Sequence, residues 1–203
     1  MRPPYAGVKF GSGHFRFAPS PPCFVTLGGT PFENRMMNSE QITRWLEEAI
    51  ALGLQGVERG DGGPFGAVIV REGVVIARGW NQVLTTHDPT AHAEIVALRE
   101  AASHLKRDHL EDCLLFSSCE PCPMCLAALY WARIQMVYFA ADRHDAAAAG
   151  FADEFLYREL VRPPSERMIP FQHHPLPQAQ EAFRRFRSQP NARLYGPPPP
   201  CPP

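Results

Sequence analysis

Apolar residues recur at helical spacing over residues 38–58, which is the first regular element that the pattern predicts. Trp45 and Ala49 belong to the apolar face of this helix. Asn38 precedes it and Gln41 follows three residues later, which is the spacing of a capping box. We therefore expect an amphipathic helix over residues 38–58, with Asn38 as its cap.

Two β-rich runs follow a glycine-rich loop at residues 60–64. The runs cover residues 67–71 and 74–78, and the dipeptide Glu72-Gly73 between them is typical of a tight hairpin. The pattern predicts two adjacent antiparallel strands here.

Helices and strands alternate along the rest of the chain. A second helix is expected to start near Ala91, with Asp88 or Thr90 as its cap. The further predicted elements are a strand over 113–117, a helix over 121–133, a strand over 135–141, and helices over 153–161 and 179–187. This alternation after an opening hairpin predicts an α/β fold with helices on both faces of the sheet.

Proline sets the two ends of the chain apart. Of the 22 prolines, 6 lie in residues 1–31 and 6 in residues 197–203. The predicted organisation is a disordered extension over 1–36, a domain over 37–162, a C-terminal segment over 163–196 and a proline-rich tail over 197–203. An alternative for the extension is that translation starts at Met36 or Met37.

Composition narrows the function classes. The 203 residues are 45% hydrophobic, and no run of about 18 apolar residues occurs, so we expect no membrane-spanning helix. Residues 38–196 hold 16 basic and 20 acidic side chains. Because phosphate contacts require Lys and Arg, this acidic balance argues against nucleic acid as a partner.

Three of the six cysteines, Cys119, Cys122 and Cys125, lie within seven residues of one another. No secretory signal is recognisable, so we expect a cytoplasmic protein. In that reducing compartment, clustered thiols indicate metal binding or catalysis rather than a disulfide framework.

Two short segments carry the candidate chemistry, and each lies at the predicted N-terminus of a helix. His92, Cys122 and Cys125 can bind one zinc ion and leave a fourth position for water, as catalytic zinc sites do. Glu94 can then act as general base and general acid. The alternatives are a closed structural zinc site that includes Cys119, as in a non-enzymatic zinc protein, and a redox dithiol.

The spacing His-x-Glu, then Pro-Cys-x-x-Cys, is the signature of zinc-dependent nucleobase deaminases. With these residues the chain resembles the cytidine deaminase superfamily, and further stretches resemble its bacterial-type guanine deaminases. The stretches are 62–70 (GGPFGAVIV), 88–94 (DPTAHAE), 118–133 (SCEPCPMCLAALYWAR), 145–160 (DAAAAGFADEFLYREL) and 166–171 (ERMIPF). The resemblance implies a zinc-dependent deaminase domain over 37–162, with a three-layer α/β/α fold and a mixed sheet of about five strands.

The same resemblance implies a homodimer with one zinc ion per subunit, in which the C-terminal segment helps to close the partner's active site. The implied reaction converts guanine to xanthine and ammonia, with Glu94 as the proton carrier. Asn81 and Asp153 would orient the purine, and Asp153 could also relay a proton. Tyr195 would be the closing residue from the partner.

Phe65 and Trp131 are candidates for the walls of the purine pocket, although either could equally belong to the core. Two rival activities use the same zinc chemistry: deamination of another small ring, such as cytosine, a pterin or an aminotriazine, and deamination of adenosine in tRNA. The acidic balance and the GFADEFLY stretch argue against the tRNA substrate.

Overall fold

The computed structural model describes residues 37–193 of the chain. These residues fall into two compact units, which meet in the sequence at His174 and Pro175. The predicted N-terminal extension, the proline-rich tail and Tyr195 lie outside the described residues.

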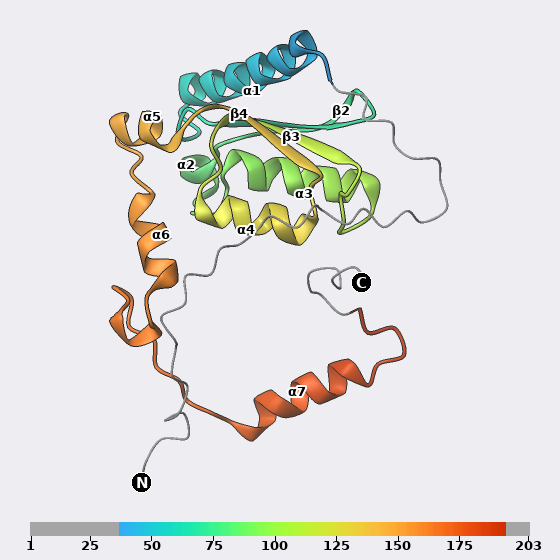
Figure 1. Ribbon diagram of the computed structural model, residues 1–203, viewed down its shortest axis with the longest axis vertical. Coiled ribbons are helices and arrows are strands. Elements are labelled where there is room, and N and C mark those ends of the chain that lie inside the picture. The colour runs from blue at the N-terminus through green and yellow to red at the C-terminus, as the bar shows by residue number, and fades with distance from the viewer. Residues whose placement is uncertain (1–36, 194–203) are drawn as a thin grey trace, which may run out of the picture. The chain divides into compact units, whose positions relative to one another are not determined.

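The first unit contains all the strands of the described chain (Figure 1). Its elements are α1 (Ser39–Arg59), β1 (Gly66–Arg71), β2 (Val74–Trp80), α2 (Val83–Thr86), α3 (Ala93–Leu105), β3 (Cys113–Cys119), α4 (Pro123–Ala132), β4 (Met136–Ala141), α5 (Arg143–Ala148), α6 (Glu154–Val161) and the 3-10 helix η1 (Pro164–Glu166). The second unit contains α7 (Pro177–Arg187).

The strands form one mixed sheet in the order β2-β1-β3-β4. Strand β1 is antiparallel to both β2 and β3, whereas β3 and β4 are parallel. Strands β2, β3 and β4 therefore all run in the same direction, and the residues that follow their carboxyl ends lie at one edge of the sheet. We call this the carboxyl edge, which is where ligands bind in open α/β sheets.

The expectation of about five strands is wrong by one for the described chain. The sheet has four strands, because the segments that follow β4 form the helices α5 and α6 rather than another strand. The α/β/α layering is confirmed: α1 covers one face of the sheet, and α3 and α4 cover the other (Figure 1).

Helix ends agree with the sequence at α1 and differ at α3. Asn38 caps α1, and its reciprocal hydrogen bonds with Gln41 complete the predicted capping box. The N-cap of α3 is His92, not Asp88 or Thr90. The Asp88 carboxylate instead accepts hydrogen bonds from the backbone N–H and the hydroxyl of Thr90, so it stabilises the turn before the helix.

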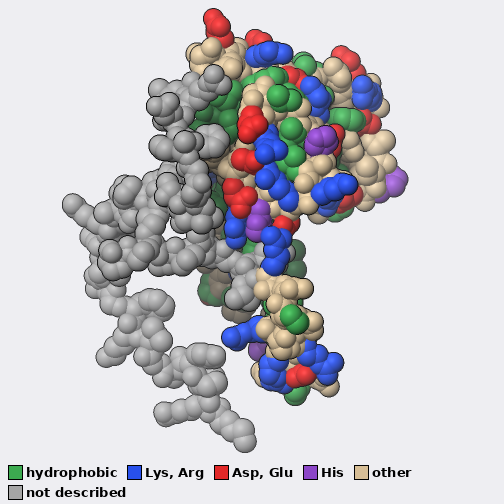
Figure 2. Space-filling view, turned by 90° about the vertical axis from the view of Figure 1, so that its right-hand side faces the viewer, with side chains coloured by type: hydrophobic (Ala, Val, Ile, Leu, Met, Phe, Trp, Pro, Cys, Tyr) green, Lys and Arg blue, Asp and Glu red, His purple; other side chains and the backbone are tan. Residues whose placement is uncertain are grey.

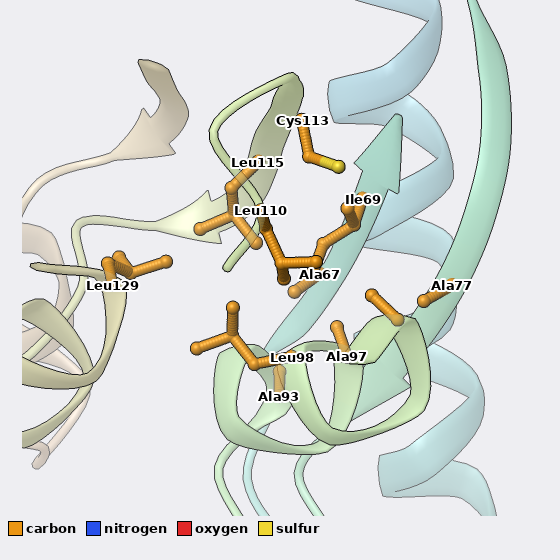
Figure 3. Close-up of a cluster of buried hydrophobic side chains, with 11 residues drawn as sticks. Ala67, Ile69, Ala77, Ala93, Ala97, Leu98, Leu110, Cys113, Leu115 and Leu129 are labelled. Atoms are coloured by element: carbon orange, nitrogen blue, oxygen red, sulfur yellow. The ribbon is translucent and has the colours of Figure 1, made fainter. Parts of the chain in front are cut away.

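Alternation along β1 divides the core between the two faces of the sheet. Val68 and Val70 pack with Trp45 of α1, whereas Ala67 and Ile69 point to the other face. The buried cluster on the face of Ala67 and Ile69 is the larger of the two. Figure 3 shows it, with side chains from α3, β3 and α4 gathered around Ile69 and Leu110. Each helix layer is thus fixed to the sheet by its own buried cluster.

Close approach of α3 to the sheet depends on Gly79 in β2. A Cβ atom at Gly79 would lie 2.2 Å from the carbonyl oxygen of Ala93 in the first turn of α3. Any larger residue would push this turn outward. Glycine here therefore brings the start of α3, with His92 and Glu94, close to the carboxyl edge.

The surface mixes charges of both signs. Acidic and basic side chains are interspersed over the face of the first unit that Figure 2 shows. Several charged side chains of the described residues form ion pairs, and Arg78 with Glu48 is one of them. No helix within residues 37–193 combines the length and the apolar character that crossing a membrane requires.

Candidate active site

Three metal-binding side chains meet at the carboxyl edge. His92 is the N-cap of α3, Cys122 is the N-cap of α4, and Cys125 lies in the first turn of α4. The His92 Nδ1 atom is 3.5 Å from the Cys122 Sγ and 3.6 Å from the Cys125 Sγ. The fold thus brings together residues that are 30 and 33 positions apart in the sequence.

These distances fit a zinc ion. Tetrahedral zinc with Zn–S bonds of about 2.3 Å and Zn–N bonds of about 2.0–2.1 Å places sulfur and nitrogen about 3.5–3.6 Å apart. The ligand atoms of His92, Cys122 and Cys125 all lie within 4.8 Å of one another, and they form the metal-binding group found among the described residues. Three protein ligands leave one position open, as in catalytic zinc sites.

His92, Cys122 and Cys125 change one another's pKa values. The hydrogen bond from Cys125 lowers the pKa of Cys122 to about 4, against the opposing effect of burial, and His92 lowers it further. The hydrogen bond to Cys122 raises the pKa of His92 in turn. The Cys122 thiolate is therefore available at neutral pH, which is the form that binds a metal.

Glu94 lies directly beside the cluster and is only 6% exposed. Its carboxylate accepts a hydrogen bond from the Cys125 thiol at 3.5 Å and one from the Ser117 hydroxyl at 3.4 Å. Burial raises the pKa of Glu94. A raised pKa makes a carboxyl group a better proton acceptor, as general acid–base catalysis requires.

Cys119 is not part of the cluster. It ends β3, and its thiol donates to the carbonyl oxygen of Asp142 at 3.6 Å. Burial raises its pKa to about 11, so the thiol stays protonated. The geometry therefore does not support the alternative of a closed zinc site that includes Cys119.

Asn81 follows β2 at the carboxyl edge and is 6% exposed. Its side-chain oxygen accepts hydrogen bonds from the backbone N–H groups of Gly63 and Val83, at 3.2 and 3.3 Å. A Cβ atom at Gly62 would lie 2.0 Å from this oxygen, so the loop needs glycine there. Because the oxygen is occupied, the NH₂ group is the part of Asn81 left to donate to a ligand.

Asp61, in the loop before β1, binds the chain on both sides of Asn81. The sequence did not indicate this role. Its carboxylate accepts from the Trp80 indole N–H at 2.8 Å and from the Thr85 hydroxyl at 2.9 Å. Its carbonyl oxygen accepts the backbone N–H of Leu84 at 3.0 Å. An acidic residue in a glycine-rich loop carries no sequence signal for such a role.

Asp153 is the N-cap residue of α6. Its Oδ1 atom is buried and has no hydrogen-bond partner. Burial raises the pKa of Asp153, and the nearby charge of Cys122 raises it further. The carboxyl group is therefore close enough to the cysteine cluster to interact with its charge.

The structure places the two candidate aromatic walls differently. Phe65 is half-buried in the loop before β1, and its ring contacts Phe151 edge-on with centroids 4.9 Å apart. Trp131 is 63% exposed near the C-terminal end of α4, away from the first turn that holds Cys125. Within one chain, Trp131 is not brought to the cluster.

A second polar pair, Arg143 with Glu120, was also not identified from the sequence. Arg143, the first residue of α5, forms several hydrogen bonds with the carboxylate of Glu120, and its guanidinium lies 4.4 Å from the ring centroid of Tyr157. Glu120 stands two positions before Cys122 in the sequence. Distant salt bridges of this kind cannot be read from local sequence patterns.

Comparisons with known proteins agree with this geometry. Residues 39–141 match the family described as the cytidine and deoxycytidylate deaminase zinc-binding region. The chain is 50% identical to the guanine deaminase of Bacillus subtilis over 151 residues, which cover 74% of this chain and 97% of that protein. It is 34% identical to the tRNA-specific adenosine deaminase of Aquifex aeolicus over 144 residues, covering 70% of this chain and 91% of that protein.

Solved structures give the same picture. The crystal structure of the Bacillus subtilis guanine deaminase matches with a TM-score of 0.74 and 49% identity, covering 78% of this chain and 99% of that one. The structure of NE0047 in complex with 2,6-diaminopurine matches with a TM-score of 0.52 and 33% identity, covering 54% of this chain and 61% of that one. The chain therefore belongs to the cytidine and deoxycytidylate deaminase family of zinc-dependent enzymes.

Proposed function

We propose that this protein catalyses the zinc-dependent hydrolytic deamination of guanine to xanthine and ammonia. The observation that carries the choice of substrate is the 50% identity to a guanine deaminase along 97% of that protein's length. The chemistry is carried by the cluster of His92, Cys122 and Cys125 with Glu94 buried beside it.

In this proposal His92, Cys122 and Cys125 hold the zinc ion. Zinc bound at such a site lowers the pKa of a water molecule, so that the water can act as a nucleophile at neutral pH. The residues themselves supply the geometry: helix N-termini at Cys122 and His92 present partial positive charge, which stabilises the thiolates.

Glu94 moves the protons of the reaction. It first accepts a proton from the attacking water and gives it to N3 of the purine, which allows C2 to become tetrahedral. It then takes the remaining hydroxyl proton and delivers it to the exocyclic amine, so that the C2–N bond breaks and ammonia leaves. Its burial and raised pKa suit both directions of transfer.

Asn81 and Asp153 orient the purine. The free NH₂ group of Asn81 can donate to an acceptor on the ring, and the unpartnered Asp153 Oδ1 can accept from an N–H group. Phe65 supports a flat wall with Phe151. A buried polar group that loses its partner costs about 1–3 kcal/mol, so this pair would discriminate between bases.

The protein is proposed to act as a homodimer in which the C-terminal segment and Tyr195 help to close the partner's site. Support comes from apolar side chains that stay exposed in one chain near α6 and beyond it. They are Phe155, Leu160, Val161, Met168, Ile169 and Phe171. The exposed Trp131 on α4 would also be available to a second subunit.

A cytoplasmic location suits this site. The described cysteines are all free, and the two proposed cysteine ligands of zinc, Cys122 and Cys125, need to stay reduced. Purine bases are the proposed small-molecule partners, and no nucleic acid is needed as a substrate. The folded part carries more acidic than basic side chains, which disfavours a long polyanion.

The substrate is tested with purified zinc-loaded protein by measuring ammonia release. The values of kcat/KM for guanine, cytosine, adenine, an aminotriazine and an adenosine-containing tRNA anticodon stem are compared side by side. Guanine should be the best substrate. If another substrate is better, the guanine assignment is wrong while the deaminase assignment stands.

Assembly is tested by truncating the chain after Val161. The shortened protein should lose both dimer formation and activity, measured by light scattering and by ammonia release. A truncated protein that stays active as a monomer would contradict the proposed dimer.

A further inference from the structure

Arg143 connects three parts of the molecule that are separate in the sequence. Its Nε atom donates to both carboxylate oxygens of Glu120, at 3.1 and 3.0 Å, and its backbone N–H donates to the same carboxylate at 3.1 Å. Its guanidinium also stacks on the ring of Tyr157, 4.4 Å from the centroid. The side chain is therefore held on two sides by defined partners.

One of these partners leads directly to the zinc ligands. Glu120 follows β3, its backbone N–H donates to the carbonyl oxygen of Ala141 at 2.8 Å, and Pro121 and Cys122 come next in the chain. Arg143 therefore joins the loop that begins α4 to the loop that begins α5. Both loops lie at the carboxyl edge.

The other partner leads to the proposed substrate contact. Tyr157 and Asp153 are four positions apart, which places them one helical turn apart at the start of α6. Within one chain this helix has no fully buried residue, so few contacts inside the subunit fix its position. Among the described residues, two ring contacts join residues 151–157 to the rest of the unit. They are the contact of Arg143 with Tyr157 and the contact of Phe65 with Phe151.

We propose that Arg143 is a positioning residue, which links Glu120 to Tyr157 and thereby holds Asp153 at the correct distance from the zinc cluster. This inference rests on the proposed function, because Asp153 matters here only as a contact to the purine. Arg143 itself does not contact the reacting atoms in this proposal, since its guanidinium is occupied by Glu120 and Tyr157.

The fork of the guanidinium explains why arginine is needed. A lysine would keep the positive charge, but it could neither form paired hydrogen bonds with Glu120 nor stack in the same way on Tyr157. Arg143→Lys should therefore loosen the start of α6 while the fold and the zinc ligands stay in place. We expect kcat/KM for guanine to fall about tenfold, mainly through a higher KM, because small displacements of positioning groups have large effects.

The matched control is Arg158→Lys. Arg158 also lies on α6, where it pairs with Glu154 in an exposed i,i+4 ion pair. Exposed pairs of this kind contribute little, so the control should keep wild-type KM. Tyr157→Phe, which keeps the ring under Arg143, should behave like the control, whereas Tyr157→Leu should behave like Arg143→Lys.

A double-mutant comparison separates positioning from general support of the fold. In an Asp153→Ala background, Arg143→Lys should change kcat/KM by less than about twofold, since the residue that it positions is gone. The proposed positioning role is wrong if Arg143→Lys lowers kcat/KM by the same factor with and without Asp153. It is also wrong if Arg143→Lys causes loss of zinc.

Two readouts do not depend on guanine turnover. Hydrogen exchange of the zinc-loaded, full-length protein should become faster over residues 151–157 in Arg143→Lys and stay unchanged in Arg158→Lys. Binding of 8-azaguanine should weaken with the same pattern if the site holds purines. Unchanged exchange in Arg143→Lys would overturn the positioning role, whereas faster exchange without any purine binding would leave it standing and contradict the proposed substrate.

Discussion

The zinc cluster and the start of α6 lie at the same edge of the sheet but are held in different ways. Glu94 is buried on α3 and Cys125 is buried on α4, and both helices pack against the sheet through a large apolar cluster. Asp153 begins a helix that has no fully buried residue. The groups proposed for proton transfer and metal binding thus stand on the rigid core, and a group proposed for substrate selection stands on its periphery.

This difference separates the demands of the reaction from those of substrate selection in this chain. Reaction geometry must be kept within a fraction of an ångström, which a packed core provides. A peripheral helix fixed by a few polar contacts can change with little cost to stability. The chain is similar both to a guanine deaminase and to a tRNA-specific adenosine deaminase.

The largest effect is expected when a ligand is removed from the rigid region. Cys125→Ser should lose zinc and with it all measurable deamination, because two remaining ligands hold the ion poorly. Cys119→Ser is the matched control, since this thiol lies outside the cluster. Metal content by mass spectrometry checks the pair, and equal zinc loss in both variants would refute the three-ligand assignment.

Glu94→Gln should remove activity while zinc stays bound. An amide of the same shape cannot accept the proton from water, and general acid–base groups contribute about 10²–10⁴-fold. The measurements are kcat and zinc content of the same preparation. Near-normal turnover would exclude Glu94 as the proton carrier.

Asp153→Ala tests the peripheral region and should have a smaller effect. We expect kcat/KM for guanine to fall by about one to two orders of magnitude, because an unpaired polar contact costs about 1–3 kcal/mol. Zinc content and thermal stability should stay unchanged. If this variant loses zinc or unfolds, Asp153 supports the core and the contrast between the two regions fails.

The smallest effect is expected at the hydrogen bond between Trp80 and Asp61, which joins the loops around Asn81. Trp80→Phe removes one hydrogen bond to Asp61, worth about 1 kcal/mol, and should raise KM about fivefold by loosening the loop that holds Asn81. Trp45→Phe is the control, since its indole N–H is buried without a partner. Trp45→Phe should lower the melting temperature through lost packing and leave KM unchanged. An equal change of KM in the two variants would show that the Trp80–Asp61 hydrogen bond does not position Asn81.

Local patterns in the sequence determined most elements of the fold. The capping box at Asn38, the hairpin at Glu72-Gly73 and the apolar spacing of α1 act over a few residues, so they can be recognised without knowing the fold. The His-x-Glu and Pro-Cys-x-x-Cys motifs likewise identified the side chains that gather in the metal-binding cluster.

Tertiary structure decided everything that depends on contacts between distant segments. It set the order β2-β1-β3-β4, excluded Cys119 from the cluster and left Trp131 exposed at the far end of α4. It also brought Asp61 to Trp80 and Arg143 to Glu120, pairs that are 19 and 23 positions apart. Such pairs form because the sheet aligns the carboxyl ends of three strands, and no local pattern in the chain records that alignment.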